Sequence, residues 1–111
     1  DDHYGGLATA RAEGERMTKA LGNHSVMMHA NHGATTAGPT VAAAFYDLYY
    51  LEKICQEYFL VVSSGAAPRV IDEKTAAQVA KDLMDEYEEG SAMTWAAWKR
   101  VLDREEPDYK D

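Results

Sequence analysis

The sequence predicts a layered α/β domain, of which this chain supplies only a part. Two short apolar stretches, residues 25–30 and 34–37, flank a turn at Asn31-His32-Gly33, as two neighbouring strands would. Long stretches with apolar residues at helical spacing follow them. Two short strands form no stable sheet by themselves, so we expect helices over a sheet that is completed by residues absent from this sequence or by another chain.

Length and composition favour a single folded unit over residues 1–111. The 111 residues are 46% hydrophobic and 27% charged, which is typical of globular proteins and not of disordered chains. At this length, folding is expected to bury about two-thirds of the surface that the unfolded chain exposes. The chain is therefore expected to fold, alone or with a partner.

The charge balance argues against nucleic acid and membrane partners. The formal net charge is -8, which repels phosphate backbones and anionic membranes, and the basic residues are interleaved with acidic ones. No apolar run is long enough to span a bilayer, and the first residues lack the pattern of a secretion signal. Cys55 is the only cysteine, so no intrachain disulfide is possible and a cytoplasmic location is favoured.

Two helices are predicted around the strands. The first follows the flexible pair Gly5-Gly6, with Thr9 as its cap and Gly22 as its end, and its inward positions are Ala10, Gly14, Met17 and Leu21. The second begins after the cap Thr40 and carries an apolar stripe of Val41, Ala44, Phe45, Leu48, Leu51, Cys55, Tyr58, Phe59 and Val62. Its tyrosines are expected to pack within the domain, with burial against a second subunit as the alternative; these are Tyr46, Tyr49 and Tyr50.

Two more helices are predicted after a loop at residues 63–69. Asp72 starts the first, and Gly90 is expected to end it; its inward positions are Ala76, Val79, Leu83 and Tyr87. Thr94 is expected to cap the last helix, and Pro107 to end it; its apolar face consists of Trp95, Trp98, Val101 and Leu102.

The histidines are the residues that could carry metal chemistry. Neutral imidazole is a common ligand of zinc and similar ions, but the ordinary role of a single histidine is a surface or hydrogen-bonded residue. His32 differs from His3 and His24 because a buried strand precedes it and a glycine follows it, which places it at a strand end. His29 and His32 face opposite sides of an extended strand, so they could share an ion only if the turn at Asn31 swings His32 round.

Several segments together resemble the C-terminal half of class II aldolase/adducin domains. They are residues 2–8 (DHYGGLA), 13–17 (EGERM), 30–33 (ANHG), 38–45 (GPTVAAAF) and 51–52 (LE). The closing segment, residues 98–109 (WKRVLDREEPDY), is similar to the tail of adducin-like bacterial and fungal members. The likeness therefore runs nearly from end to end.

The resemblance implies a three-layer αβα domain around a central, mostly antiparallel sheet, to which this chain contributes about two short strands and about four helices. It also implies a homo-oligomer, commonly a tetramer. In catalytic members three histidines bind zinc or a related divalent ion, and His32 matches the last of them. Asn31 and Gly33 match its neighbours, and Asn31 is expected to orient the turn or the imidazole through a hydrogen bond. His29 departs from the family pattern, and its side chain is expected to point elsewhere.

The other two ligands and the acid/base residue belong to an earlier part of the family's domain. No catalytic residue is therefore expected within this chain, and the missing N-terminal part of the domain is its first expected partner. Completed in that way, the protein is expected to be a metal-dependent lyase that cleaves a small hydroxylated carbonyl compound of the sugar-phosphate type. The alternatives are a non-catalytic adducin-like scaffold and a remnant that folds only when docked to its missing half.

Overall fold

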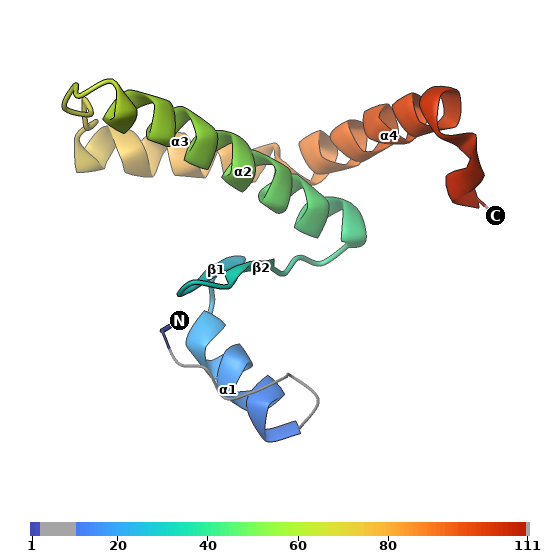
Figure 1. Cartoon of the computed structure of the whole chain (residues 1–111), viewed down its shortest axis with the longest axis horizontal. Helices are drawn as coiled ribbons and strands as arrows, with labels where there is room; N and C mark the ends of the chain where they lie inside the picture. The colour runs from blue at the N-terminus through green and yellow to red at the C-terminus, as the bar shows by residue number, and fades with distance from the viewer. Residues whose placement is uncertain (3–10, 111) are drawn as a thin grey trace.

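The computed structural model describes residues 1–2 and 11–110. Within them, four α-helices, two strands and a short 3₁₀ helix follow one another in the order α1, β1, β2, α2, α3, α4, η1 (Figure 1). The predicted strands and helices of an α/β chain are thus confirmed, whereas the three-layer arrangement stays a prediction about the completed domain.

The first part of the structure is α1 and a hairpin. Helix α1 spans Arg11–Leu21 and ends where Gly22 turns with a φ of 58°, as expected. The predicted cap Thr9, the inward position Ala10 and the glycine pair before them lie outside the described residues. Strands β1 (Val26–His29) and β2 (Gly33–Thr36) pair antiparallel, with Met27 opposite Thr35. Both predicted strands are confirmed.

Helix α2 spans Val41–Ser63 and is joined to the hairpin at its first turn. Thr40 caps the helix as predicted, because its hydroxyl accepts a hydrogen bond from the Ala43 amide at 3.1 Å. The Thr36 hydroxyl of β2 donates to the Ala44 carbonyl at 2.9 Å. These two bonds fix the direction in which α2 leaves the hairpin.

The boundary between the last two helices is not where the sequence pattern predicts it. Helix α3 spans Glu73–Asp85 after the cap Asp72, and α4 spans Tyr87–Glu105. Only Glu86, with φ -106° and ψ 2°, interrupts the helical path. The predicted stop at Gly90 and the predicted cap at Thr94 are therefore wrong, because Tyr87 and Trp95 pack on α2 on either side of this stretch and packing outweighs local preference. As expected, α4 ends before Pro107, which begins η1 (Pro107–Lys110).

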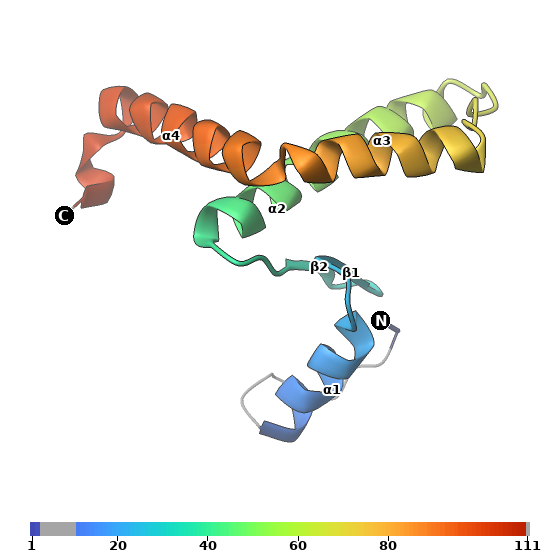
Figure 2. The same cartoon turned by 180° about the vertical axis from the view of Figure 1, so that it is seen from behind.

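The chain is far less compact than its length suggests. Its radius of gyration is 17.0 Å, whereas a compact chain of this length is expected at about 13 Å. Its accessible surface is 9213 Å², against about 6,100 Å² for a compact protein of this mass. Figure 2 shows α1 and the group α2–α4 on opposite sides of the hairpin. The expected burial of two-thirds of the surface is not reached.

The described residues form almost no core. Met27 and Ala43 are the buried apolar residues among them, and Ser91 is the buried polar one. Many positions that the helical spacing predicts as inward are exposed instead, among them Val41, Leu48, Cys55, Tyr58, Phe59, Val62, Val79 and Leu83. The described elements therefore cover only part of the apolar faces that the spacing predicts, mainly where α2 and α4 meet.

Candidate functional site

The candidate ligand His32 lies in the three-residue loop of the hairpin. His29 and Gly33 are opposite one another at the end of the ladder, so Ala30, Asn31 and His32 form the connection. Asn31 adopts a left-handed conformation with φ 57°, and Gly33 has φ 131°, a value that favours glycine. Asn31 therefore shapes the turn through its backbone, and its side chain forms no hydrogen bond with another described residue.

The His32 side chain is exposed at this turn. No group within residues 1–2 and 11–110 forms a hydrogen bond with its ring nitrogens. Its ring meets that of His29 edge to face, with 6.3 Å between the centroids. The two rings are therefore neighbours across the left-handed turn at Asn31, although the nitrogens of His29 are directed to other groups, as expected.

His29 is nevertheless held by other groups. Its Nε2 lies 2.8 Å from the Thr35 hydroxyl, and its Nδ1 lies 3.5 Å from the Asp1 carboxylate. Both ring nitrogens are thus engaged, and a metal ion would have to displace one of these partners. The two histidines therefore have different roles. His29 connects β1 to β2 and to Asp1, whereas the His32 imidazole is exposed.

An ion-pair network connects the same hairpin to α1. The Arg16 guanidinium donates to both carboxylate oxygens of Asp1 at 2.8 Å, and it also binds Glu13. Hydrogen bonding to Glu13 raises the pKa of Arg16, so the guanidinium stays charged. The fork geometry of the Asp1 pair fixes the orientation of both side chains. Asp1 therefore links α1 to His29 beside the candidate ligand.

Sequence reasoning missed Asp1, Arg16 and Thr35 at this site. The hairpin register could have revealed Thr35. Gly33 lies opposite His29, and Thr35 follows two residues later on the same face of the sheet, so its side chain is next to that of His29. Nothing local in the sequence indicates that Arg16 meets Asp1, because that contact depends on how α1 folds back.

The described residues fit one ligand position and not a whole metal site. No three His, Cys, Asp or Glu side chains in the described part of the chain gather closely enough to hold an ion. His24 is exposed before β1, and His3 lies outside the described residues. A divalent ion needs several donors, so His32 could serve only with ligands supplied from elsewhere.

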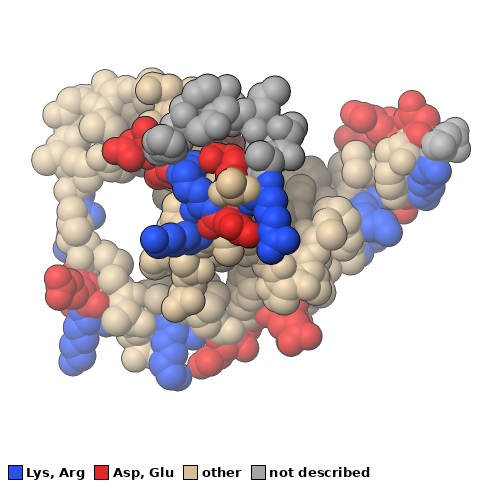
Figure 3. Space-filling model, turned by 90° about the horizontal axis from the view of Figure 1, so that it is seen from below, with Lys and Arg blue, Asp and Glu red and all other residues tan. Residues whose placement is uncertain are grey.

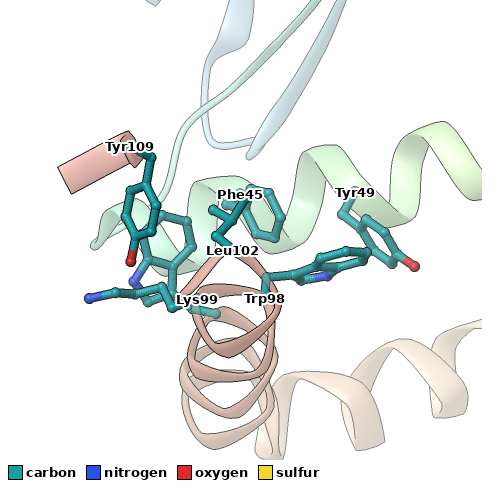
Figure 4. Close-up of a pocket in the computed structure, with 7 residues that line it drawn as sticks. Phe45, Tyr49, Trp98, Lys99, Leu102 and Tyr109 are labelled. Atoms are coloured by element: carbon teal, nitrogen blue, oxygen red, sulfur yellow. The ribbon is translucent and has the colours of Figure 1, made fainter. Parts of the chain in front are cut away.

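A second candidate region is an aromatic pocket of about 590 Å³ between α2, α4 and η1. Figure 4 shows Tyr49 and Trp98 on one side of Leu102 and Tyr109 on the other. The walls are packed aromatic rings. The ring centroids of Phe45 and Trp95 are 5.3 Å apart, and those of Tyr49 and Trp98 are 5.5 Å apart. The lining is apolar apart from Lys99 and the tyrosine hydroxyls, so it lacks a ligand set for a metal.

A tyrosine cluster joins α2 to the start of α4 beside this pocket. The Tyr87 ring lies 5.7 Å from Tyr46, and its hydroxyl donates to the Ala43 carbonyl at 3.3 Å. Burial is the main cause that raises the pKa of Tyr87 to about 12, and a hydrogen bond with the Asp47 carboxylate is the second. Tyr87 therefore stays protonated at neutral pH and acts as a structural donor. Tyr46 thus packs within the chain, as expected for the tyrosines of α2, whereas Tyr50 is 43% exposed.

The surface charges form no extended basic face around α1. In Figure 3, where α1 is near the viewer, Lys and Arg side chains are interspersed with Asp and Glu. Arg11 pairs with Glu15, and Arg16 pairs with Glu13 and Asp1. None of the helices in the described part of the chain is both long and apolar enough to cross a bilayer.

The chain is similar to several known proteins, two of which have names of the aldolase class 2 type. A protein of Caulobacter vibrioides, provisionally named an aldolase class 2 protein, is 29% identical over 97% of this chain and 42% of its own length. A similarly named protein of Pseudomonas aeruginosa is 27% identical over 96% of this chain and 43% of its own length. The 4-hydroxy-3-prenylphenylpyruvate oxygenase/4-hydroxy-3-prenylbenzoate synthase of Streptomyces roseochromogenus is 31% identical over 75% of this chain and 31% of its own length.

The chain spans less than half the length of these relatives. No solved structure matches it significantly. Residues 2–59, which include the hairpin and most of α2, match the family described as Class II Aldolase and Adducin N-terminal domain. With His32 in that matched stretch and relatives of aldolase type along nearly the whole chain, the protein belongs to the class II aldolase/adducin family.

Proposed function

We propose that this chain is part of a divalent-metal lyase and that His32 is one of its metal ligands. The complete enzyme would cleave a small hydroxylated carbonyl compound of the sugar-phosphate type. The observation that carries the proposal is the exposed His32 imidazole in the hairpin turn of a class II aldolase/adducin chain, with its ring nitrogens unengaged by the described residues. Zinc is the first choice of metal because imidazole is one of its usual ligands.

The remaining groups of the proposed site come from outside this chain. His32 is a single donor, and the relatives are more than twice as long as the stretch they share with the chain. We place the other ligands and the acid/base residue in the N-terminal part of the same domain, or in another copy within a homo-oligomer, by resemblance to the family. A bound divalent ion supplies charge stabilisation for oxygens that become negative during cleavage. This chain would hold and orient one ligand.

Metal analysis of the intact protein tests the role of His32. His32→Ala should lower metal affinity by on the order of tenfold or more, since it removes a direct ligand. His24→Ala is the matched control, because His24 is an exposed histidine outside the hairpin. Circular dichroism spectra of both variants would check that the fold persists. Equal metal content in all three proteins would refute the assignment of His32.

An activity assay would then define the substrate class. A sugar phosphate is the primary substrate to test, and an aromatic 2-oxo acid belongs beside it because one relative carries a phenylpyruvate in its name. Turnover of the sugar phosphate that disappears on chelation of the metal would support the proposal. Turnover of the aromatic acid alone would replace the substrate class and leave the ligand role of His32 intact.

A non-catalytic scaffold is the second candidate function. It is favoured by the large apolar area on the C-terminal half of α2 and on α3, where Phe59, Leu60 and Leu83 are each more than half exposed. Phe59→Ser in the intact protein should then reduce its assembled mass in sedimentation experiments, while Glu57→Ser leaves it unchanged. Catalytic turnover by the wild-type protein would exclude a scaffold without chemistry.

A further inference from the structure

The two edges of strand β1 are occupied differently. On one edge, β1 pairs with β2, and the ladder continues where the Ala37 amide donates to the Ser25 carbonyl at 2.8 Å. Main-chain groups alternate in direction along a strand of an antiparallel pair. Because Ser25 faces β2, Val26 and Met28 direct their amides and carbonyls toward the other edge.

Asp1 already occupies one position on that other edge. Its main-chain nitrogen donates to the Met28 carbonyl at 2.7 Å, and its carbonyl accepts from the Ala30 amide at 2.8 Å. In an antiparallel pair, a residue exchanges both bonds with a single partner residue. Asp1 instead bonds to the two residues on either side of His29, which is the pattern of a parallel pair.

The connection between Asp1 and β1 also suits a parallel pair. Parallel neighbours need a crossover of about a dozen residues or more, which is usually a helix. Here the crossover contains α1, and Arg16 on that helix is tied to the Asp1 carboxylate by two hydrogen bonds of 2.8 Å. The order Asp1, α1, β1 therefore has the connectivity of a strand–helix–strand unit.

We infer that the outer edge of β1 is a docking edge for an extended segment that leads into Asp1 and runs parallel to β1. The next bonds along this edge would use the Val26 carbonyl and the Met28 amide. The relatives, of whose length this chain spans less than half, have the additional residues from which such a strand could come. The inference goes beyond the proposed lyase function, because it rests on main-chain hydrogen bonds and not on a metal or a reaction.

Docking of this strand would also stabilise the hairpin that presents His32. The strand would end at Asp1, whose carboxylate lies 3.5 Å from Nδ1 of His29. The other nitrogen of His29 bonds to Thr35 on β2, so the contacts cross the sheet from the added strand to β2. Docking of the added strand would therefore also restrict the position of the loop that carries His32.

Amide hydrogen exchange of Met28 tests the docking edge. Three proteins would be compared: the chain of residues 1–111, the same chain preceded by the designed extension Val-Thr-Val-Thr, and that extension with proline as the second residue before Asp1. In a parallel ladder, that second residue donates to Val26 and accepts from Met28, and proline has no amide to donate. The Val-Thr extension should slow Met28 exchange by roughly fivefold to tenfold, and the proline version by much less.

The Ala37 amide provides the internal control, because it bonds to Ser25 on the β2 side. Because this amide already has its partner, its exchange rate should change much less than that of Met28 among the three proteins. Equal Met28 exchange in all three would overturn the inference, as would loss of Ala37 protection in the extended chain. Protection of Met28 in the unextended chain that rises with protein concentration would assign the edge to a second copy and overturn the proposed occupant.

Discussion

The two halves of α2 carry the same kind of apolar pattern but have different surroundings. In the first half, Phe45 and Tyr49 pack against the tryptophans of α4, and Ala43 is 2% exposed. In the second half, Phe59 and Leu60 are both 69% exposed. The contrast shows that helical spacing reports a face that needs covering, while the covering element depends on the rest of the fold. The second half of α2 therefore keeps an apolar surface that the described elements leave largely exposed.

The largest predicted difference between the two halves comes from removing one aromatic ring in each region. Trp95→Ala should lower the free energy of unfolding by about 2–3 kcal/mol, because Trp95 packs on Phe45. Phe59→Ala should change it by less than about 0.5 kcal/mol, because that ring is mostly exposed. Chemical denaturation followed by circular dichroism measures both. Similar losses would contradict the contrast, whereas a larger cost of Phe59→Ala in the complete protein would reveal the covering element.

Substitutions at two glycines test how tightly the start of α2 is packed. A Cβ at Gly38 would lie 2.9 Å from both the Ala43 Cβ and the Ala44 nitrogen, so Gly38→Ala forces the start of α2 to move. We expect it to destabilise the protein by about 1–3 kcal/mol. Gly14→Ala is the matched control, because a Cβ there meets nothing within 4 Å, and alanine in α1 should be neutral or stabilising. Equal unfolding midpoints for the two variants would show that the contact at Gly38 relaxes easily.

The cap of α2 is expected to have a smaller effect. Thr40→Ala removes the hydroxyl that accepts from the Ala43 amide and should cost about 1 kcal/mol of stability. Thr40→Ser keeps the acceptor and should retain most of that stability. Thermal unfolding of the three proteins tests this. A loss in Thr40→Ser as large as in Thr40→Ala would assign the effect to the methyl group.

The smallest predicted effect is a pH dependence at the end of α4. Hydrogen bonds from Lys110 and Tyr109 hold the pKa of Asp103 below its usual 3.8. Because the pKa of Asp103 is lower in the folded protein than in the unfolded one, its contribution to stability is complete above the unfolded pKa. That contribution is lost as the pH falls through the folded pKa. NMR titration of the Asp103 carboxyl group should show the lowered pKa. Asp103→Asn should flatten this part of the acid unfolding profile, and an unchanged profile would contradict the linkage.

Much of the local structure follows from the sequence alone. The caps at Thr40 and Asp72, the turn at Asn31 and His32 and the helix end before Pro107 all depend on interactions among near neighbours; each is predicted by the pattern, although Gly33 of the predicted turn pairs in β2. The break at Glu86 has no strong local signal, and Gly90 gives a misleading one. That boundary could not be predicted because contacts between α4 and α2 keep the helix intact through Gly90.

The candidate site shows the same division. The sequence identifies His32 and the glycine that follows it, because a strand end and a turn are local features. Only the tertiary structure places His29 beside His32 and brings Asp1 to Arg16 and to the edge of β1. The contacts of Asp1 join residues distant in the sequence and depend on how α1 folds back, whereas His29 and His32 are three residues apart and meet through the turn at Asn31. Local propensities therefore determined the elements of this protein, whereas long-range packing decided which faces are covered and which remain exposed.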